Sequence, residues 1–191
     1  MSYQDRYVEH RARKARELGA DVKVLGYGKL SRRSRRRFEG VSIDRWERTQ
    51  LLWAIANAPS SCNRGGVWVQ WVDSAEQRCR WGEMLVGGVG WAQHAAAIIL
   101  LWADPECYQH HNDVMGARLA DQDGAFAACM AHVRACEIGV ASCYICPNLI
   151  EGASSTLLNR GWRLTGALAV GYPMYPELEP PPKREAEEVL L

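Results

Sequence analysis

The feature that most constrains how this chain can fold is a continuous apolar run from Ala95 to Ala103. It is far shorter than the roughly 20 apolar residues that a transmembrane helix needs, so it does not predict a membrane span. His94 and Asp104 bound the run, and a short apolar run between polar residues is typical of a strand buried on both faces of a sheet. We therefore expect a central strand here.

Helices and strands are predicted around this strand, and they follow no regular alternation. Helices are expected at 43–57, with Ser42 as the N-cap, at 76–85 and at 121–137, and further strands at 67–71, 140–145 and 167–170. A doubly wound sheet requires regular alternation of strands and helices. The order of elements therefore predicts an α+β fold.

The predicted helix 121–137 carries a stripe of mostly small residues. The stripe consists of Gly124, Ala125, Ala128, Cys129, His132, Val133 and Cys136, and Gly139 is expected to end the helix. Small residues allow a neighbouring helix to approach closely, so we expect a central helix or a subunit-interface helix. His132 is interpreted as a core or interface histidine with satisfied hydrogen bonds, and Cys129 and Cys136 as small core residues.

Composition narrows the choice of partners and compartment. The net charge is +1, which gives no global electrostatic reason to expect a nucleic-acid or membrane partner. The N-terminus is charged and lacks the apolar core of a signal peptide. Seven cysteines in a chain without an export signal are expected to be reduced thiols. We therefore expect a cytoplasmic protein.

Arginine is concentrated near the N-terminus. Residues 1–29 are expected to form a basic helical extension, with an amphipathic helix at 3–18, ahead of one domain at 30–191. The run from Arg32 to Phe38 reads Arg-Arg-Ser-Arg-Arg-Arg-Phe. On its own it leaves three interpretations open: a nucleic-acid or localisation patch, a solvated face, and an anion site. Ser34 places a hydroxyl beside planar guanidinium groups, which suits a phosphate monoester.

Three further segments follow the arginine run in order. They read Ala-Pro-Ser-Ser-Cys-Asn-Arg at 58–64, Gly-Val-Ala-Ser-Cys-Tyr-Ile at 139–145, and Gly-Tyr-Pro at 171–173 before a proline-rich stretch with Lys183 and Arg184. In order and spacing, the four segments together resemble the motifs of the nitroreductase family. The resemblance covers residues 30–191.

This resemblance implies both an architecture and a reaction. The architecture is a central mixed sheet flanked by helices in an intertwined homodimer, with FMN in two clefts at the interface. The family mechanism is ping-pong: NADH or NADPH passes hydride to flavin N5, and a quinone, nitroaromatic or related electron-poor acceptor then takes it. The implied partners are a second copy of the chain and a small-molecule acceptor.

The resemblance also assigns the site residues. The implied cofactor-binding residues are Arg32, Arg33, Ser34, Arg36, Pro59, Ser60, Ser61, Asn63, Cys146, Lys183 and Arg184. The first four are implied to lie near the flavin phosphate, ribityl chain and pyrimidine edge, and the last two near the phosphate. The loop 59–63 is implied to line the ring or ribityl chain from the other subunit, and the amide of Cys146 to face N5. No metal site is expected, because the polar cluster at 104–113 is interpreted as a solvated loop.

Two departures from the family pattern keep alternatives open. Gly65-Gly66-Val67 stands where the family often has Gln-Pro-Trp, and Cys146-Pro147 stands near the position that faces N5. Proline has no amide to donate. A specialised flavoenzyme that dehydrogenates a peptide-derived substrate, removes halogen or consumes the flavin is one alternative. A basic module that binds nucleic acid or another partner without redox activity is the other.

Overall fold

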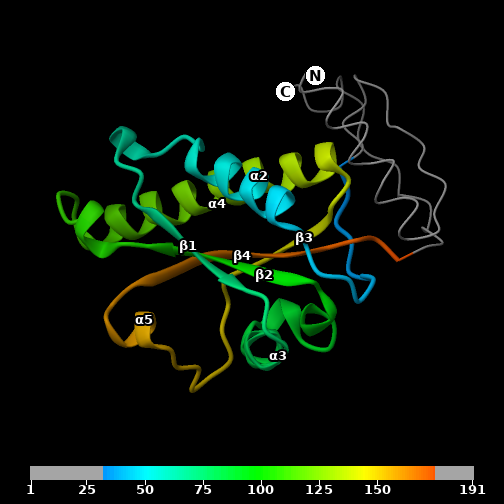
Figure 1. Ribbon diagram of the computed structural model, residues 1–191. Helices are drawn as coiled ribbons and strands as arrows, with labels where there is room; N and C mark the ends of the chain where they lie inside the picture. The colour runs from blue at the N-terminus through cyan, green and yellow to red at the C-terminus, as the bar shows by residue number, and fades with distance from the viewer. Residues whose placement is uncertain (1–31, 175–191) are drawn as a thin grey trace, which may run out of the picture.

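The computed structural model describes residues 32–174 and contains one antiparallel sheet with helices on both faces (Figure 1). Its strands lie in the order β1 (Val67–Val72), β2 (Ala97–Ala103), β4 (Arg163–Gly171) and β3 (Ala141–Ile145). All three strand pairs are antiparallel, so the expected mixed sheet is wrong for these strands. Parallel pairing in the described part is a single bridge between Ser34 and Ser142. The α+β class is confirmed.

Strand β2 is central, and all of its residues are buried, as the apolar run predicted. Its side chains alternate between two cores because successive residues of a strand point to opposite faces. Ile98, Leu100 and Trp102 pack in one core. Ala97, Ile99 and Leu101 pack in the other, against residues of α2 (Arg45–Ala56) and α4 (Asp113–Ile138). The sheet is thus the middle layer, with α2 and α4 on one face and α3 (Ala75–Met84) and α5 (Thr156–Asn159) on the other (Figure 1).

Helix α2 begins two residues later than expected, at Arg45. Asp44, not Ser42, is the N-cap, and it forms a capping box with Glu47. The correction follows from chemistry, since a carboxylate at the N-cap and a glutamate three residues later satisfy two backbone N–H groups reciprocally. Glu47 is also buried and accepts a hydrogen bond from the hydroxyl of Tyr172, which ties α2 to the residue after β4.

Helix α4 is the longest element, and it begins at Asp113 rather than 121. Asn112 caps it by accepting a hydrogen bond from the amide of Met115, and Gly139 ends it in the left-handed region at φ 77°. From the sequence, the polar cluster at 104–113 is interpreted as a loop, so a helix that begins at Asp113 was not predicted.

The small-residue stripe of α4 is divided between two faces of the helix. Gly124, Ala128 and His132 are buried, and a Cβ on Gly124 would lie 2.2 Å from the Thr165 hydroxyl oxygen. Cys129 is exposed and Cys136 half-buried, so the expectation of two core cysteines is wrong. The helix has small residues both toward the sheet and toward solvent.

The predicted N-terminal extension, 1–29, and the pair Lys183 and Arg184 lie outside the described residues. Between 32 and 174, no helix has the length and apolar character needed to cross a bilayer.

Candidate functional site

The arginine run is an extended segment fixed by backbone hydrogen bonds to two strands. Ser34 bridges Ser142 in the parallel sense, and the amide of Arg35 donates to the Ser142 carbonyl at 2.9 Å. Further along, the amide of Glu39 donates to the carbonyl of Tyr172 at 2.9 Å. The segment therefore covers the β3 edge of the sheet and then reaches the end of β4 (Figure 1).

Three residues of this segment lie near enough to the buried residue Cys143 to act on its thiol. Burial raises the pKa of the Cys143 thiol, while the charge of Arg36, a hydrogen bond with Ser34 and the charge of Arg32 act in the opposite direction. Two guanidinium groups and a hydroxyl are thus gathered at the start of β3, which makes this place electropositive.

Aromatic packing holds Arg36 in place. Its guanidinium carbon lies 5.6 Å from the centre of the Trp91 ring, a cation–π contact. The ring of Phe38 stacks against the same Trp91 ring, with 6.5 Å between the two centroids. Phe38, which closes the motif, therefore has a structural role. It is buried, and it packs against the tryptophan that contacts Arg36.

His132 connects the segment to α4. A guanidinium nitrogen of Arg32 lies 2.6 Å from its Nε2, and its Nδ1 lies 2.5 Å from the Ser142 hydroxyl oxygen. Burial, and secondarily Arg32, lower the pKa of His132 to about 4, so the ring is neutral at neutral pH. The sequence predicted a satisfied core histidine, which is confirmed, but not its contact with the arginine run.

The loop 59–63 has an unusual backbone. Cys62 and Asn63 both have φ of 54°, a left-handed conformation that few residues other than glycine adopt. Buried Asp123 holds the loop, accepting from the amide of Ser61 at 2.9 Å and from its hydroxyl at 2.9 Å. The Ser60 hydroxyl accepts from the amide of Gly65 at 2.9 Å. Both serine hydroxyls therefore shape the loop itself.

The glycine pair at 65–66 has a structural explanation. Gly65 has φ of 59°, and a Cβ on Gly66 would lie 2.8 Å from Cβ of Cys107 and 2.9 Å from the ring of Tyr108. The Tyr108 hydroxyl in turn donates to Asp123 at 2.9 Å. The departure at 65–66 thus makes room for a tyrosine that supports the same carboxylate as the loop. Asp123 and Tyr108 carry no motif signal that sequence reasoning could have used.

Within one chain the two motifs are attached to different parts of α4. The loop is attached to α4 at Asp123 and the arginine run at His132. These positions are nine residues apart on one helix, which corresponds to about 14 Å along its axis. Asn63 and Pro59 are exposed on their side of the molecule.

Cys146 follows the last residue of β3 and is exposed, whereas Cys143 is buried. The chain after it is fixed to the end of α3, because the amide of Val86 donates to the Asn148 carbonyl at 2.9 Å and the amide of Ile150 to the Met84 carbonyl at 2.9 Å. The Cys146-Pro147 pair is therefore held at a defined place, at the opposite end of β3 from Ser142.

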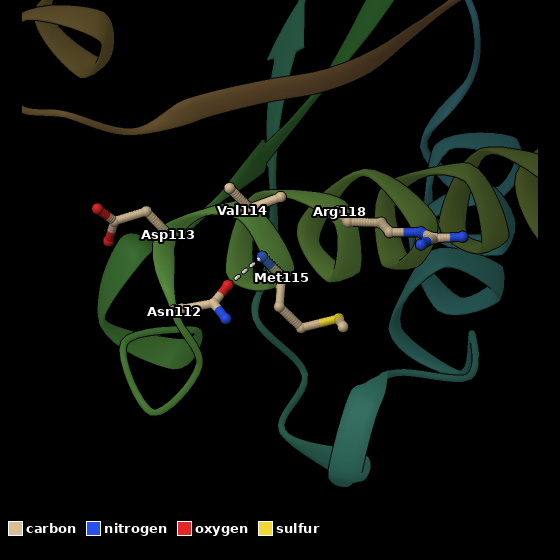
Figure 2. A pocket seen from close by; sticks show the side chains of 5 residues that line it. All are labelled: Asn112, Asp113, Val114, Met115 and Arg118. Carbon is tan, nitrogen blue, oxygen red and sulfur yellow. Dashed lines mark hydrogen bonds between the residues drawn. The ribbon is translucent and has the colours of Figure 1, made fainter.

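Two surface hollows lie away from the predicted cofactor-binding residues. One, of ≈ 450 Å³, is lined by Asn112, Asp113, Val114, Met115 and Arg118 at the start of α4 (Figure 2). The other, of ≈ 330 Å³, lies between the start of α2 and Trp71. Neither contains a predicted site residue. Among residues 32–174, no three His, Cys, Asp or Glu side chains are grouped as metal ligands.

Solved structures share this architecture. The FMN-dependent nitroreductase from Clostridium difficile R20291 matches with a TM-score of 0.65 and 22% identity, over 84% of this chain and 91% of that one. The NADPH:FMN oxidoreductase from Vibrio harveyi matches with 0.67 and 22%, over 85% and 74%. A nitroreductase family protein from Clostridium difficile 630 matches with 0.67 and 16%, over 85% and 94%. The described chain has the nitroreductase fold.

The family resemblance that the order of the four motifs predicted is confirmed in the fold, and the homodimer stays a prediction. Neither protein-family profiles nor curated proteins give a match to this sequence. The similarity is thus visible in the fold rather than in sequence identity.

Proposed function

We propose that this chain is an FMN-dependent oxidoreductase that takes hydride from NADH or NADPH and passes it to a small electron-poor acceptor such as a quinone or nitroaromatic. The observation that carries the proposal is the course of the arginine run along β3, where Ser34 bridges Ser142 and the charges of Arg32 and Arg36 act on Cys143, in a chain with the nitroreductase fold. The similar structures are described as FMN-dependent or as acting with NADPH and FMN, which supports the same cofactor here.

The residues present fit FMN. A phosphate dianion gains short, charge-assisted hydrogen bonds from guanidinium and hydroxyl donors, and the segment offers Arg32, Arg33, Ser34 and Arg36 within one short extended stretch. Lys183 and Arg184 are proposed to add to the phosphate contacts. Asn63, with an exposed side chain on a rigid loop, is proposed to line the ring or ribityl chain, together with Pro59 and the backbone of Ser60 and Ser61.

FMN supplies the hydride-accepting and hydride-donating chemistry when bound. The chain supplies binding, orientation and electrostatics. Arg36 brings a fixed positive charge, held by Trp91, to the side of the site that is proposed to meet the pyrimidine edge. Cys146 presents its backbone amide as a donor toward N5. Pro147 has no backbone N–H to donate, so Cys146 is the one of these two residues whose amide is proposed to donate to N5.

We propose further that the site is completed by a second copy of the chain. The two motifs lie on different parts of α4 in one protomer, and the solvent face of α4 carries large exposed apolar side chains. These are Val114, Met115, Phe126 and Met130, of which Phe126 is 49% exposed. Phe126 and Met130 lie one helical turn apart, and exposed apolar neighbours favour an interaction site; a homodimer across α4 would cover them and bring the loop of one copy to the arginine run of the other.

The test is an absorbance spectrum of the purified protein, followed by addition of NADH and NADPH separately without oxygen. Two oxidised-flavin bands that bleach on mixing support the proposal and identify the donor. A colourless protein that also takes up no added FMN would refute it, and the arginine run would then be interpreted as a binding surface.

A second candidate is a specialised flavoenzyme with the same fold. The observation that favours it is the Cys146-Pro147 pair, which is held in place but leaves only one amide near the position proposed for N5. This candidate predicts flavin bands that dithionite bleaches and neither nicotinamide does.

A further inference from the structure

The buried hydrogen-bonded chain Ser142–His132–Arg32 lies behind the arginine run and is not explained by packing. His132 is 7% exposed and has a polar partner on each ring nitrogen. The neighbouring buried positions of α4 are alanines, among them Ala128, Ala131 and Ala135. An apolar residue would fill this space without needing two partners, so the histidine serves the groups it contacts.

We propose that His132 is a positioning residue: as a neutral ring protonated on Nδ1, it fixes the Arg32 guanidinium in the orientation that receives the FMN phosphate. The inference rests on the proposed function, because it assigns a role toward FMN. Its geometry stands independently of any ligand.

The protonation state follows from the chemistry of the partners. A guanidinium has only N–H donors and cannot accept a hydrogen bond. Nε2 of His132, 2.6 Å from Arg32, must therefore be the unprotonated acceptor. A neutral ring then carries its proton on Nδ1 and donates it to the Ser142 hydroxyl oxygen, 2.5 Å away. The partner on one nitrogen thus sets the tautomer that the other nitrogen needs.

Ser142 makes this arrangement specific to the arginine run. Its hydroxyl accepts from His132, and its backbone carbonyl accepts from the amide of Arg35. One residue of β3 therefore sets both the backbone position of the run and, through His132, the direction of Arg32. A long arginine side chain has a large rotamer entropy, and fixing it before the ligand arrives lowers the entropic cost of binding.

Two variants of similar size separate this role from packing. In His132→Gln the side-chain oxygen can take the place of Nε2 and still accept from Arg32. In His132→Asn the side-chain amide takes the place of Nδ1 and can donate to Ser142, but the asparagine is too short to accept from Arg32. We expect the Kd for FMN to stay within about threefold of the wild type in H132Q and to rise about tenfold or more in H132N, the loss typical of a hydrogen bond to a charged group.

Arg32→Ala is the control for the route of the effect. In an R32A background, H132N and H132Q are expected to have the same Kd for FMN, because the residue through which His132 acts is gone. A difference that persists in this background would overturn the proposal, as would equal Kd values for H132N and H132Q in the wild-type background. Flavin fluorescence titration measures each Kd, and far-ultraviolet circular dichroism establishes that each variant is folded.

A second measurement needs neither FMN nor a variant at position 132. In ¹⁵N-labelled protein without flavin, the His132 ring is expected to show a protonated Nδ1 and an unprotonated Nε2 by NMR. Arg32→Ala removes the group that requires Nε2 to accept a hydrogen bond, and in this variant the two tautomers are expected to mix. The opposite tautomer in the wild-type protein would overturn the proposal.

Different results would refute the proposed function and the role of His132. Wild-type protein that binds no FMN would refute the proposed function and leave the tautomer result standing. Wild-type protein that binds FMN, with H132N and H132Q alike, would refute the role of His132 alone.

Discussion

At the scale of the residue, Gly66 shows how close packing connects a motif loop to the rest of the fold. A Cβ at this position would lie 2.8 Å from Cβ of Cys107 and 2.9 Å from the Tyr108 ring. Gly66→Ala is therefore expected to lower the free energy of unfolding by about 1–3 kcal/mol, the typical cost of overpacking, and to displace the Tyr108 hydroxyl from Asp123. Urea denaturation measures the change.

Gly40→Ala is the matched control, because a Cβ on Gly40 meets no atom within 4 Å and its φ is not in the left-handed region. Its effect on the free energy of unfolding is expected to stay within about 0.5 kcal/mol. If Gly66→Ala were as harmless as Gly40→Ala, the contact between Gly66 and Tyr108 would not matter for stability.

His132 gives the protein a pH dependence whose sign can be worked out. Burial, and then Arg32, lower its pKa from 6.5 to about 4 in the folded state. As the pH falls below 6.5 the unfolded chain takes up a proton and the folded chain does not, so stability falls until the pH reaches about 4. The groups that face the ring are Arg32, which stays charged over this range, and the Ser142 hydroxyl.

The loss of stability between these pH values is expected to be on the order of 2 kcal/mol, and His132→Gln should remove it. Urea denaturation of both proteins at the two ends of the window measures the difference. Parallel curves for wild type and variant would mean that His132 titrates as it does in the unfolded chain.

Sequence reasoning identified residues that belong to a local pattern and missed those that depend on packing. Arg32, Ser34 and Arg36 stand in one short run with a closing phenylalanine, so the segment could be read directly. Asp123 and its partner Ser61 are separated by 62 positions. No local spacing connects them, and a single acidic residue in a helix is ordinarily a solvent-exposed one.

At the scale of the element, α4 is the support to which both motif segments are attached. The sequence predicted its C-terminal end at Gly139 because glycine at the C-cap is a strong local signal. Its start was missed because Asn112 lies in a polar segment that reads equally well as a loop. The sequence also could not tell which small residues of the stripe face the sheet and which face solvent. Small residues on both sides of a helix leave little amphipathic contrast.

Asp123→Asn tests whether α4 holds the motif loop. The carboxylate accepts from the Ser61 amide, the Ser61 hydroxyl and the Tyr108 hydroxyl, and an amide would turn one oxygen into an N–H that faces donors. We expect a loss of about 1–3 kcal/mol in the free energy of unfolding. Because Cys62 and Asn63 would then leave the left-handed region, trypsin is expected to cleave faster after exposed Arg64.

Asp121→Asn is the matched control on the same helix. Asp121 pairs with Arg163 at 2.7 Å on the surface, where both side chains are about half exposed. A surface pair of this kind contributes about 0–1 kcal/mol, and the loop should be no more sensitive to trypsin than in the wild type. Equal sensitivity of the two variants would contradict the role of Asp123.

At the scale of the whole molecule, the proposed dimer makes a prediction about which copy supplies which motif. Arg32→Ala and Asn63→Ala are each expected to lower the affinity of the protein for FMN, as homodimers of a single variant. In a mixed dimer the outcome depends on geometry. If each site combines the arginine run of one copy with the loop of the other, one site has both substitutions and the second site has neither.

Mixed dimers of R32A and N63A, isolated with two different affinity tags, are therefore expected to bind FMN at half of their sites with wild-type affinity. If both motifs of a site came from one chain, every site would carry one substitution and no affinity would be recovered. In one copy the two motifs are attached to α4 at points about 14 Å apart along its axis, so affinity recovered at half of the sites would establish that a second copy supplies the loop.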